Sequence, residues 1–470
     1  MIRDWIDTAA RDRGGAVYLA EARGERTLTY EGLLDAVVTW ERRLDDAGLP
    51  PGAPVAVRAG DPFDYAVTLV ALLGAGRVVV PLDPEAPPAD VARVLDIARP
   101  LAVTEGSFGI RVLRKGRGPA AGAGIYLCTS GTTGTPKGIL LRDQQLAHVA
   151  ASVAFHHDIS PNDRGYCSLP LFHVNAEVVG LLATLSAGAY LAVDRKFSRR
   201  GFWEMIEDAR ITWINAVPAI ISILAMDPPS AAPAGIRFVR SASAPLPRAA
   251  LEQFEAAFGI PVVETYGMTE AASMITANPV DGLRKPGSAG RPAGTEVRVV
   301  TVSEVGAVTP CAPSEIGRVQ IRGAGVITSY ASGGRPGVIS PDGWLDTSDL
   351  GYLDPDGYLF LVGRSDDVIN RGGEKIYPRE IEELLLAQPG VRSAAVVGAL
   401  DDVLGERPVA WVLPAEGWAP AVLEAALRDA CAASLPRPKR PATFFVVDQM
   451  PLGPTGKIAR RRLKDMAVSR

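Results

Sequence analysis

The chain has 470 residues, more than one ordinary hydrophobic core organises, so we expect a large body and at least one smaller domain. Apolar residues make up 47% of it and charged residues 22%, a balance typical of a folded globular protein and not of a disordered one. With 49 basic and 53 acidic side chains, the formal net charge of −4 gives no broad electrostatic reason to bind nucleic acid or an anionic membrane. Any anion-binding site must therefore be local.

Targeting and redox features of the sequence predict a cytoplasmic enzyme. The first residues, MIRDWIDTAARDRGG, are charged and amphipathic and do not show the pattern of an export signal. The longest apolar stretches, such as residues 216–226, are shorter than the roughly 18–20 residues that cross a bilayer, so we expect no membrane partner. The cysteines lack metal-ligand spacing, which favours core thiols over disulfides or a zinc site. They are Cys128, Cys167, Cys311 and Cys431.

Hydrophobic periodicity predicts an α/β fold for the first part of the chain. Short runs rich in Val, Ile and Ala alternate with helical patterns, as is typical of layered α/β subdomains. The alternation is seen over residues 54–57, 65–74 and 78–81, and it recurs through residues 211–217 and 236–241. After about residue 300, strands punctuated by Gly and Pro, such as residues 317–323 and 357–362, predict a β-rich subdomain.

The end of the chain predicts a small, mobile α+β domain over residues 366–470, which follows a large N-terminal catalytic domain over residues 1–365. A charged connector at Arg364 precedes a helix that opens at Pro378, because proline is well accepted in the first turn of a helix. A strand (RSAAVVG), a second helix (VLEAALRDACAASL) and another strand (TFFVVD) follow.

Residues 126–141, YLCTSGTTGTPKGILL, have the composition of a phosphate-binding loop. Glycines let the backbone approach an oxyanion closely, hydroxyl groups add donors, and Lys137 adds a positive charge. The spacing does not fit the Walker A pattern, so a P-loop NTPase is rejected. A flexible turn between two strands is the alternative, and it explains any three of these residues better than it explains the whole string.

The string TSGTTGTPKG resembles the signature loop of the adenylate-forming superfamily of acyl-CoA synthetases, peptide-synthetase adenylation domains and luciferases. Four more strings follow in the order of that family: ETYGMTE, GWLDTSDLGYLDPDGYLFLVGRSDD, NRGGEKIYPREIEE and PTGKIARRRL. The resemblance covers residues 27–465, although the stretch between Arg99 and Gly122 is unusually short. It implies ATP-dependent activation of a carboxylic acid to acyl-AMP with release of pyrophosphate, and then transfer to the thiol of CoA.

The chemistry explains these residue types, because attack of a carboxylate on the α-phosphate brings two anions together and needs charge neutralisation. The resemblance implies that Thr269 contacts the α-phosphate, that Glu270 binds Mg²⁺, and that Tyr266 stacks on adenine. Asp349 would accept both ribose hydroxyls, with Arg364 beside the same sugar. The full set implied in ATP binding is Thr129, Ser130, Gly131, Thr132, Thr133, Gly134, Lys137, Ala242, Ser243, Ala244, Thr265, Tyr266, Gly267, Asp349 and Arg364.

The resemblance also implies two half-reactions served by one small domain that turns about a hinge at Asp366. Lys457 would act in adenylation, as a catalytic residue with Thr269, Glu270 and His173. A second loop would bind CoA during thioester formation, with Arg371, Gly372, Gly373 and Lys375 as its residues. The glycines would let this loop lie against a narrow pantetheine tunnel, although a simple turn is the alternative.

The segment SLPLFHVNAE carries Phe172–His173 where amino-acid adenylation domains carry Phe-Asp, so an α-amino acid is disfavoured. FVRSASAPL and neighbouring strings resemble oxalate–CoA ligases and related short-chain synthetases, which favours a small or polar acid. Asn175 and Ser243 are further candidate contacts to this acid. The other readings are an acyl-AMP ligase that serves a carrier-protein pantetheine or an amine, and a catalytically silent scaffold, which the presence of the motif residues disfavours.

Overall fold

The structure is a computed structural model that describes residues 1–105, 108–116, 122–130, 136–226, 228, 233–303, 306–334, 336–452 and 458–468. Within these ranges no helix is long and apolar enough to cross a membrane. The four cysteines are free thiols; Cys167 and Cys431 are buried, whereas Cys128 and Cys311 are only partly buried. The expectation of four core thiols therefore holds fully for two of them.

A six-stranded sheet lies in the N-terminal part of the chain, with strand order β6-β5-β3-β4-β7-β8. Its strands are β3 (Pro54–Val57), β4 (Val78–Pro81), β5 (Ala102–Glu105), β6 (Gly109–Val112), β7 (Gly124–Ser130) and β8 (Pro136–Arg142). Helix α3 (Pro62–Gly74) and helix α4 (Pro88–Ala98) connect parallel strands, as the alternating pattern predicted. The antiparallel pair β7–β8 flanks the signature loop.

A nine-stranded sheet forms the centre of the molecule, with strand order β15-β14-β13-β12-β11-β9-β10-β1-β2. Its strands are β1 (Val17–Glu21), β2 (Thr27–Thr29), β9 (Arg164–Cys167), β10 (Tyr190–Val193), β11 (Trp213–Ala216), β12 (Phe238–Ser241), β13 (Val262–Met268), β14 (Ser273–Ala277) and β15 (Arg291–Pro292). Strands β11 and β12 are buried along their whole length, as expected of parallel strands with both faces covered.

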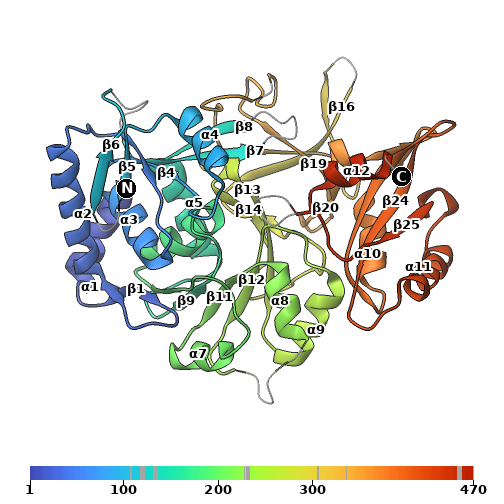
Figure 1. The fold of residues 1–470 in the computed structure, drawn as a ribbon, viewed down its shortest axis with the longest axis horizontal. Helices are drawn as coiled ribbons and strands as arrows, with labels where there is room; N and C mark the ends of the chain where they lie inside the picture. Colours follow the sequence, from blue (N-terminus) through green and yellow to red (C-terminus); the bar gives the residue numbers. More distant parts are fainter. Residues whose placement is uncertain are drawn as a thin grey trace.

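Helices from several parts of the chain pack with this sheet into one large core. They are α1 (Ile2–Arg13), α2 (Tyr30–Asp46), α5 (Asp143–His156), α6 (Ala183–Ser186), α7 (Phe202–Asp208), α8 (Pro218–Ala225), α9 (Arg248–Phe258) and the π-helix η1 (Asn175–Leu182). Figure 1 shows α8 beside α9, and α1, α2 and α3 at the opposite end of the molecule from the C-terminal residues. The two sheets therefore form a layered α/β body.

The predicted β-rich subdomain is a five-stranded antiparallel sheet with order β17-β16-β18-β19-β20. Its strands are β16 (Glu296–Val302), β17 (Val308–Pro310), β18 (Gly317–Arg322), β19 (Leu345–Leu353) and β20 (Leu359–Arg364). Strand β20 ends at Arg364, and the 3₁₀ turn η3 (Ser365–Asp367) follows at once. The predicted domain boundary and the predicted hinge at Asp366 both fall on this turn.

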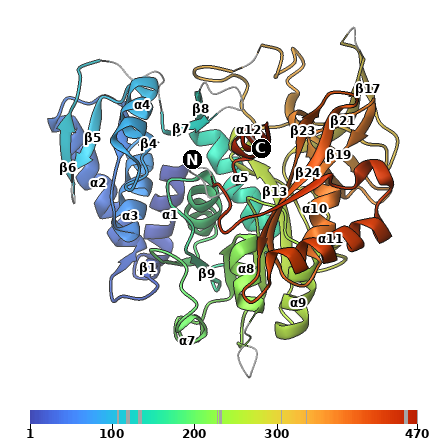
Figure 2. The same ribbon diagram turned by 45° about the vertical axis from the view of Figure 1, so that its right-hand side comes forward.

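The C-terminal part has its own sheet of β21 (Ile369–Arg371), β22 (Glu374–Ile376), β23 (Val391–Asp401), β24 (Gly405–Pro414) and β25 (Thr443–Val446). Helices α10 (Pro378–Leu386) and α11 (Pro420–Ser434) cover one face of it, and α12 (Arg460–Val468) covers the other. Figure 2 shows α10 and α11 beside β24. Helix α10 begins at Pro378, as predicted, and Arg379 reaches the large body by donating to the backbone oxygen of Leu361 at 2.9 Å.

Candidate active site

The carboxyl ends of two parallel strands bring together two of the predicted nucleotide-binding segments. Strands β12 and β13 pair with Ser241 opposite Glu264, and the Thr265 hydroxyl donates to the backbone oxygen of Ser241 at 3.0 Å. Ligands of open α/β sheets bind at such strand ends. Ser243 follows β12 with a φ of 73°, a left-handed conformation that costs a non-glycine residue about 1–3 kcal/mol and clusters at functional sites.

Tyr266, Asp349 and Arg364 form one connected group. The Tyr266 hydroxyl donates to Oδ2 of Asp349 at 2.5 Å, and Nη1 of Arg364 donates to Oδ1 at 3.3 Å. Asp349 and Arg364 are direct cross-strand partners in β19 and β20. Burial, reinforced by the negative charge of Asp349, raises the pKa of Tyr266 well above its usual value, so this hydroxyl stays a donor.

Glu270 lies in the 3₁₀ turn η2 (Thr269–Ala271), directly after β13, and is buried. The Tyr330 hydroxyl donates to its Oε1 at 3.0 Å, and the Ile327 amide donates to its backbone oxygen at 2.9 Å. Nζ of Lys137 lies 5.0 Å from the centre of the Tyr330 ring, a cation–π distance. The structure thus places the end of the signature loop and the YGMTE motif on either side of Tyr330, which the motifs did not single out.

Gly138, the last residue of the signature string, has a steric role. A Cβ at this position would overlap the Tyr126 hydroxyl and the Ser332 hydroxyl. These two hydroxyls lie 3.2 Å apart, and the Gly138 amide donates to the backbone oxygen of Ser332 at 2.9 Å. The absence of a side chain at Gly138 therefore lets the segment that contains Ser332 pack against β8. Composition alone did not reveal this packing requirement.

Several predicted residues lie outside the described residues: Gly131, Thr132, Thr133, Gly134 and Lys457. Thr129 and Ser130 belong to β7, where their backbones pair with Lys137 and Pro136. The roles predicted for all of these residues stay predictions.

The segment proposed for the acid begins beside the nucleotide residues. The rings of Phe172 and His173 have centroids 4.6 Å apart, and the π-helix η1 starts two residues later at Asn175. π-helical turns occur frequently at functional sites. Nδ2 of Asn175 donates to Oγ of Ser243 at 3.3 Å, so these two candidate contacts to the acid touch each other.

The predicted CoA loop is an exposed hairpin turn between β21 and β22. Gly372 and Gly373 have φ angles of 59° and 91°, which glycine adopts without strain. Their amides donate to the Leu404 backbone oxygen at 2.7 Å and to Oδ1 of Asn370 at 3.1 Å, both within the small domain. The segment forms a turn within the small domain, and its role in binding CoA stays a prediction.

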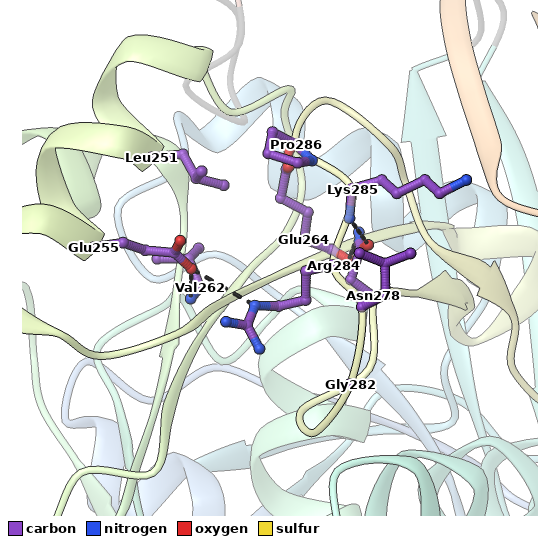
Figure 3. A pocket seen from close by; sticks show the side chains of 10 residues that line it. Leu251, Glu255, Val262, Glu264, Asn278, Gly282, Arg284, Lys285 and Pro286 are labelled. Carbon is purple, nitrogen blue, oxygen red and sulfur yellow. Dashed lines mark hydrogen bonds and ion pairs between the residues drawn. The ribbon is translucent and has the colours of Figure 1, made fainter.

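A polar pocket lies where β13 begins, between α9 and the loop 282–286 (Figure 3). Oε1 of Glu264 accepts a hydrogen bond from the Gly287 amide at 3.0 Å. Burial raises the pKa of Glu264 to about 7, and Arg379 of α10 opposes this shift. The pocket is rimmed by further charged side chains, Glu255, Arg284 and Lys285. No motif predicted it.

Comparison with known proteins shows the family to which this chain belongs. A sequence profile described as AMP-binding enzyme matches residues 6–109 and 122–331, and one described as AMP-binding enzyme C-terminal domain matches residues 380–457. The chain belongs to the AMP-binding enzyme family. The predicted adenylate-forming superfamily is thereby confirmed. The AMP-binding profile does not match residues 110–121. They belong to the segment between Arg99 and Gly122, which the sequence comparison of motifs found to be unusually short.

Individual members of the family align over nearly the whole chain. Sulfoacetate–CoA ligase of Cupriavidus necator is 37% identical, over 96% of this chain and 94% of its own length. Oxalate–CoA ligase of Arabidopsis thaliana is 33% identical, over 93% of each chain.

Solved structures share the fold. ATP-bound MatB from Rhodopseudomonas palustris superposes with a TM-score of 0.88 at 26% identity, over 99% of both chains. O-succinylbenzoate coenzyme A synthetase from Bacillus subtilis, in complex with ATP and magnesium ion, gives 0.85 at 28% identity, over 98% of this chain and 99% of its own. The predicted fold class, a large α/β domain with a β-rich part and a small C-terminal domain, is confirmed.

Proposed function

We propose that this protein is an AMP-forming acid–CoA ligase, which converts a small carboxylic acid to an acyl-adenylate and then transfers the acyl group to CoA. One observation carries the proposal: relatives aligned over more than nine tenths of both chains include sulfoacetate–CoA, oxalate–CoA and 2-succinylbenzoate–CoA ligases. Solved neighbours hold ATP and a magnesium ion. The predicted class of acid–thiol ligase and the cofactors ATP, Mg²⁺ and CoA are confirmed at this level.

The ribose and base of ATP are held by the group around Asp349. Its carboxylate offers lone pairs beyond those that Tyr266 and Arg364 use, and these can accept the two ribose hydroxyls. The Tyr266 ring, anchored through its hydroxyl, is fixed for stacking on adenine. The residues proposed to border the base are Ala242, Ser243, Ala244, Thr265 and Gly267.

The phosphates lie between the signature loop and the YGMTE turn. Lys137 supplies positive charge and Thr269 a hydroxyl donor near the α-phosphate. Glu270 fits a magnesium site, because Mg²⁺ takes one or two protein carboxylates and completes its shell with phosphates and water. Tyr330 holds one oxygen of Glu270 and thereby orients this carboxylate. When bound, the ion neutralises charge that develops on the phosphates.

The two half-reactions use two orientations of the domain formed by residues 366–470, with Asp366 as the hinge. Lys457 reaches the α-phosphate in the first orientation, and the loop from Arg371 to Lys375 meets the pantetheine thiol in the second. Support comes from the connection itself, since β20 passes into β21 through the short turn η3, in which Asp366 is exposed.

The acid occupies the region around His173, Asn175 and Ser243. CoA is the proposed acceptor because the aligned relatives are CoA ligases; a carrier-protein pantetheine or an amine is the alternative. A panel of acids tested with CoA, with a pantetheinylated carrier protein and without acceptor decides between them. We expect AMP, pyrophosphate and a CoA thioester with short acids such as oxalate, malonate or acetate. Steady release of ADP and orthophosphate would contradict adenylation.

A further inference from the structure

Arg240 is a buried cation that no described carboxylate neutralises. It lies in the centre of the sheet on β12, with 1% of its surface exposed. Nη1 donates to Oδ1 of Asn175 at 2.8 Å and to Oδ1 of Asn215 at 3.1 Å, while Nε has no hydrogen-bond partner among the described residues. An uncompensated buried charge costs a fold several kcal/mol. Stability therefore does not account for this arginine.

The arginine dictates how the two amides are turned. A guanidinium group only donates hydrogen bonds, so Asn175 and Asn215 must both present their oxygens to Arg240. The amide nitrogen of Asn175 consequently points the other way and donates to Oγ of Ser243 at 3.3 Å. Nδ2 of Asn215 faces Cys167 and Asn175 instead, at 3.8 Å and 3.5 Å. Among the described residues, Asn175 is the one that bonds both Arg240 and Ser243 directly.

This linkage determines what Ser243 can offer. Because its oxygen accepts from Asn175, its own hydrogen is directed elsewhere. The residue is exposed and follows the end of β12, where Ser241 pairs with Glu264 of β13. The strained φ of 73° holds it in this place. Arg240 donates to Asn175, and Asn175 donates to Ser243, so both hydrogen bonds run from the buried arginine toward the exposed serine. The buried positive charge thus polarises the Ser243 hydroxyl to donate to an anionic oxygen.

We propose that Arg240 is a positioning residue for the acid: through Asn175 it holds Ser243 as a hydrogen-bond donor to an anionic oxygen of the substrate, and the site thereby prefers short acids with a second anionic group. This inference rests on the proposed acid–CoA ligase function and deepens it. The second anionic group, a carboxylate or a sulfonate, supplies the negative charge that no described side chain provides to Arg240.

The variant Asn175→Asp tests the inference, because it keeps the shape of the side chain and replaces the donor NH₂ group with an accepting oxygen. Its carboxylate can pair with Arg240, so the melting temperature should stay the same or rise. Both of its oxygens accept, however, so the Ser243 hydroxyl turns toward the aspartate and away from the substrate. We expect the ratio of kcat/KM for malonate to that for propionate, measured by pyrophosphate exchange, to fall at least about tenfold, the size of one charged hydrogen bond. KM for ATP should not change.

The matched control is Asn215→Asp, which adds the same charge next to Arg240 without touching Ser243. It should lower the malonate-to-propionate ratio less than Asn175→Asp does. The apolar replacement Arg240→Met with Asn175→Leu, which removes the buried guanidinium, should fold and should lose the preference for malonate. Equal losses in the two aspartate variants, an unchanged ratio in Asn175→Asp, or a wild-type preference for propionate would each overturn the inference. A wild-type protein that exchanges pyrophosphate with no acid would instead overturn the proposed function itself.

Discussion

The hydroxyl of Tyr266 donates a hydrogen bond to Oδ2 of Asp349 at 2.5 Å, although 83 positions separate the two residues in the chain. Arg364 donates to the other oxygen of the same carboxylate, so Asp349 is held from two sides. A side chain that is already ordered loses little further freedom when it binds a ligand. The geometry thus presents a preorganised acceptor for a pair of hydroxyl groups.

Replacement of Asp349 by Ala should therefore weaken the use of ATP by roughly 1.5–3 kcal/mol, the contribution of a charged hydrogen-bond acceptor. KM for ATP in pyrophosphate exchange measures this loss. Tyr266→Phe keeps both the ring and the carboxylate and should therefore weaken the use of ATP less than Asp349→Ala does. An unchanged KM for ATP in the Asp349 variant would remove this residue from the nucleotide site.

Tyr330 should matter for magnesium, because its hydroxyl orients Glu270. Tyr330→Phe keeps the ring beside Lys137 and removes the hydroxyl that donates to the Glu270 carboxylate. We expect a several-fold rise in the Mg²⁺ concentration that gives half-maximal adenylation. Glu270→Gln should raise it further, since it removes the charge. If both variants keep the wild-type magnesium titration, Glu270 does not bind the ion.

Lys457 should act in one half-reaction only. Lys457→Ala is expected to slow adenylation by a factor on the order of 10²–10³, the usual effect of losing one group that stabilises transition-state charge. The same variant should convert supplied acyl-AMP and CoA to thioester at close to the wild-type rate, because the adenylate is already activated. Lys464→Ala, in the nearby helix α12, serves as the control and should affect neither step. Equal loss in both half-reactions would argue for a structural role.

Glu264 should make the stability of the fold depend on pH. Burial raises its pKa from 4.5 to about 7; Arg379 opposes the shift, whereas Glu383 and Glu255 add to it. Between these two values the unfolded chain binds fewer protons than the folded one, so the free energy of unfolding falls as pH rises. Glu264→Gln stays neutral and should escape this decline.

The measurement is chemical denaturation of both proteins from below pH 4.5 to above pH 7. The stability of the variant relative to wild type should increase across this range and then level off. Glu252→Gln, at an exposed position of α9, is the matched control for the loss of a carboxylate from the same region. A flat difference for the Glu264 variant would show that its carboxyl ionises as an ordinary surface group does.

The sequence by itself determined the family, the order of the motifs and most of the elements. Hydrophobic periodicity, helix-start signals and short motifs were enough to predict these features. Alternating apolar runs predicted β3, β4, β11 and β12, and Pro378 marked the start of α10 because proline needs no partner for a missing N–H. The residues assembled at Asp349 were identified because each belongs to a recognisable string.

Only the tertiary structure revealed the partners that join those strings. Tyr330 lies 60 positions from Glu270, and Arg240 lies 65 positions from Asn175, so no local pattern connects them. The requirement for Gly138 likewise comes from Tyr126 and Ser332 across the sheet. The direction of a hydrogen bond and the burial of a charge depend on which distant segments pack together. Tertiary packing decides these contacts, and they leave no periodic pattern in the sequence.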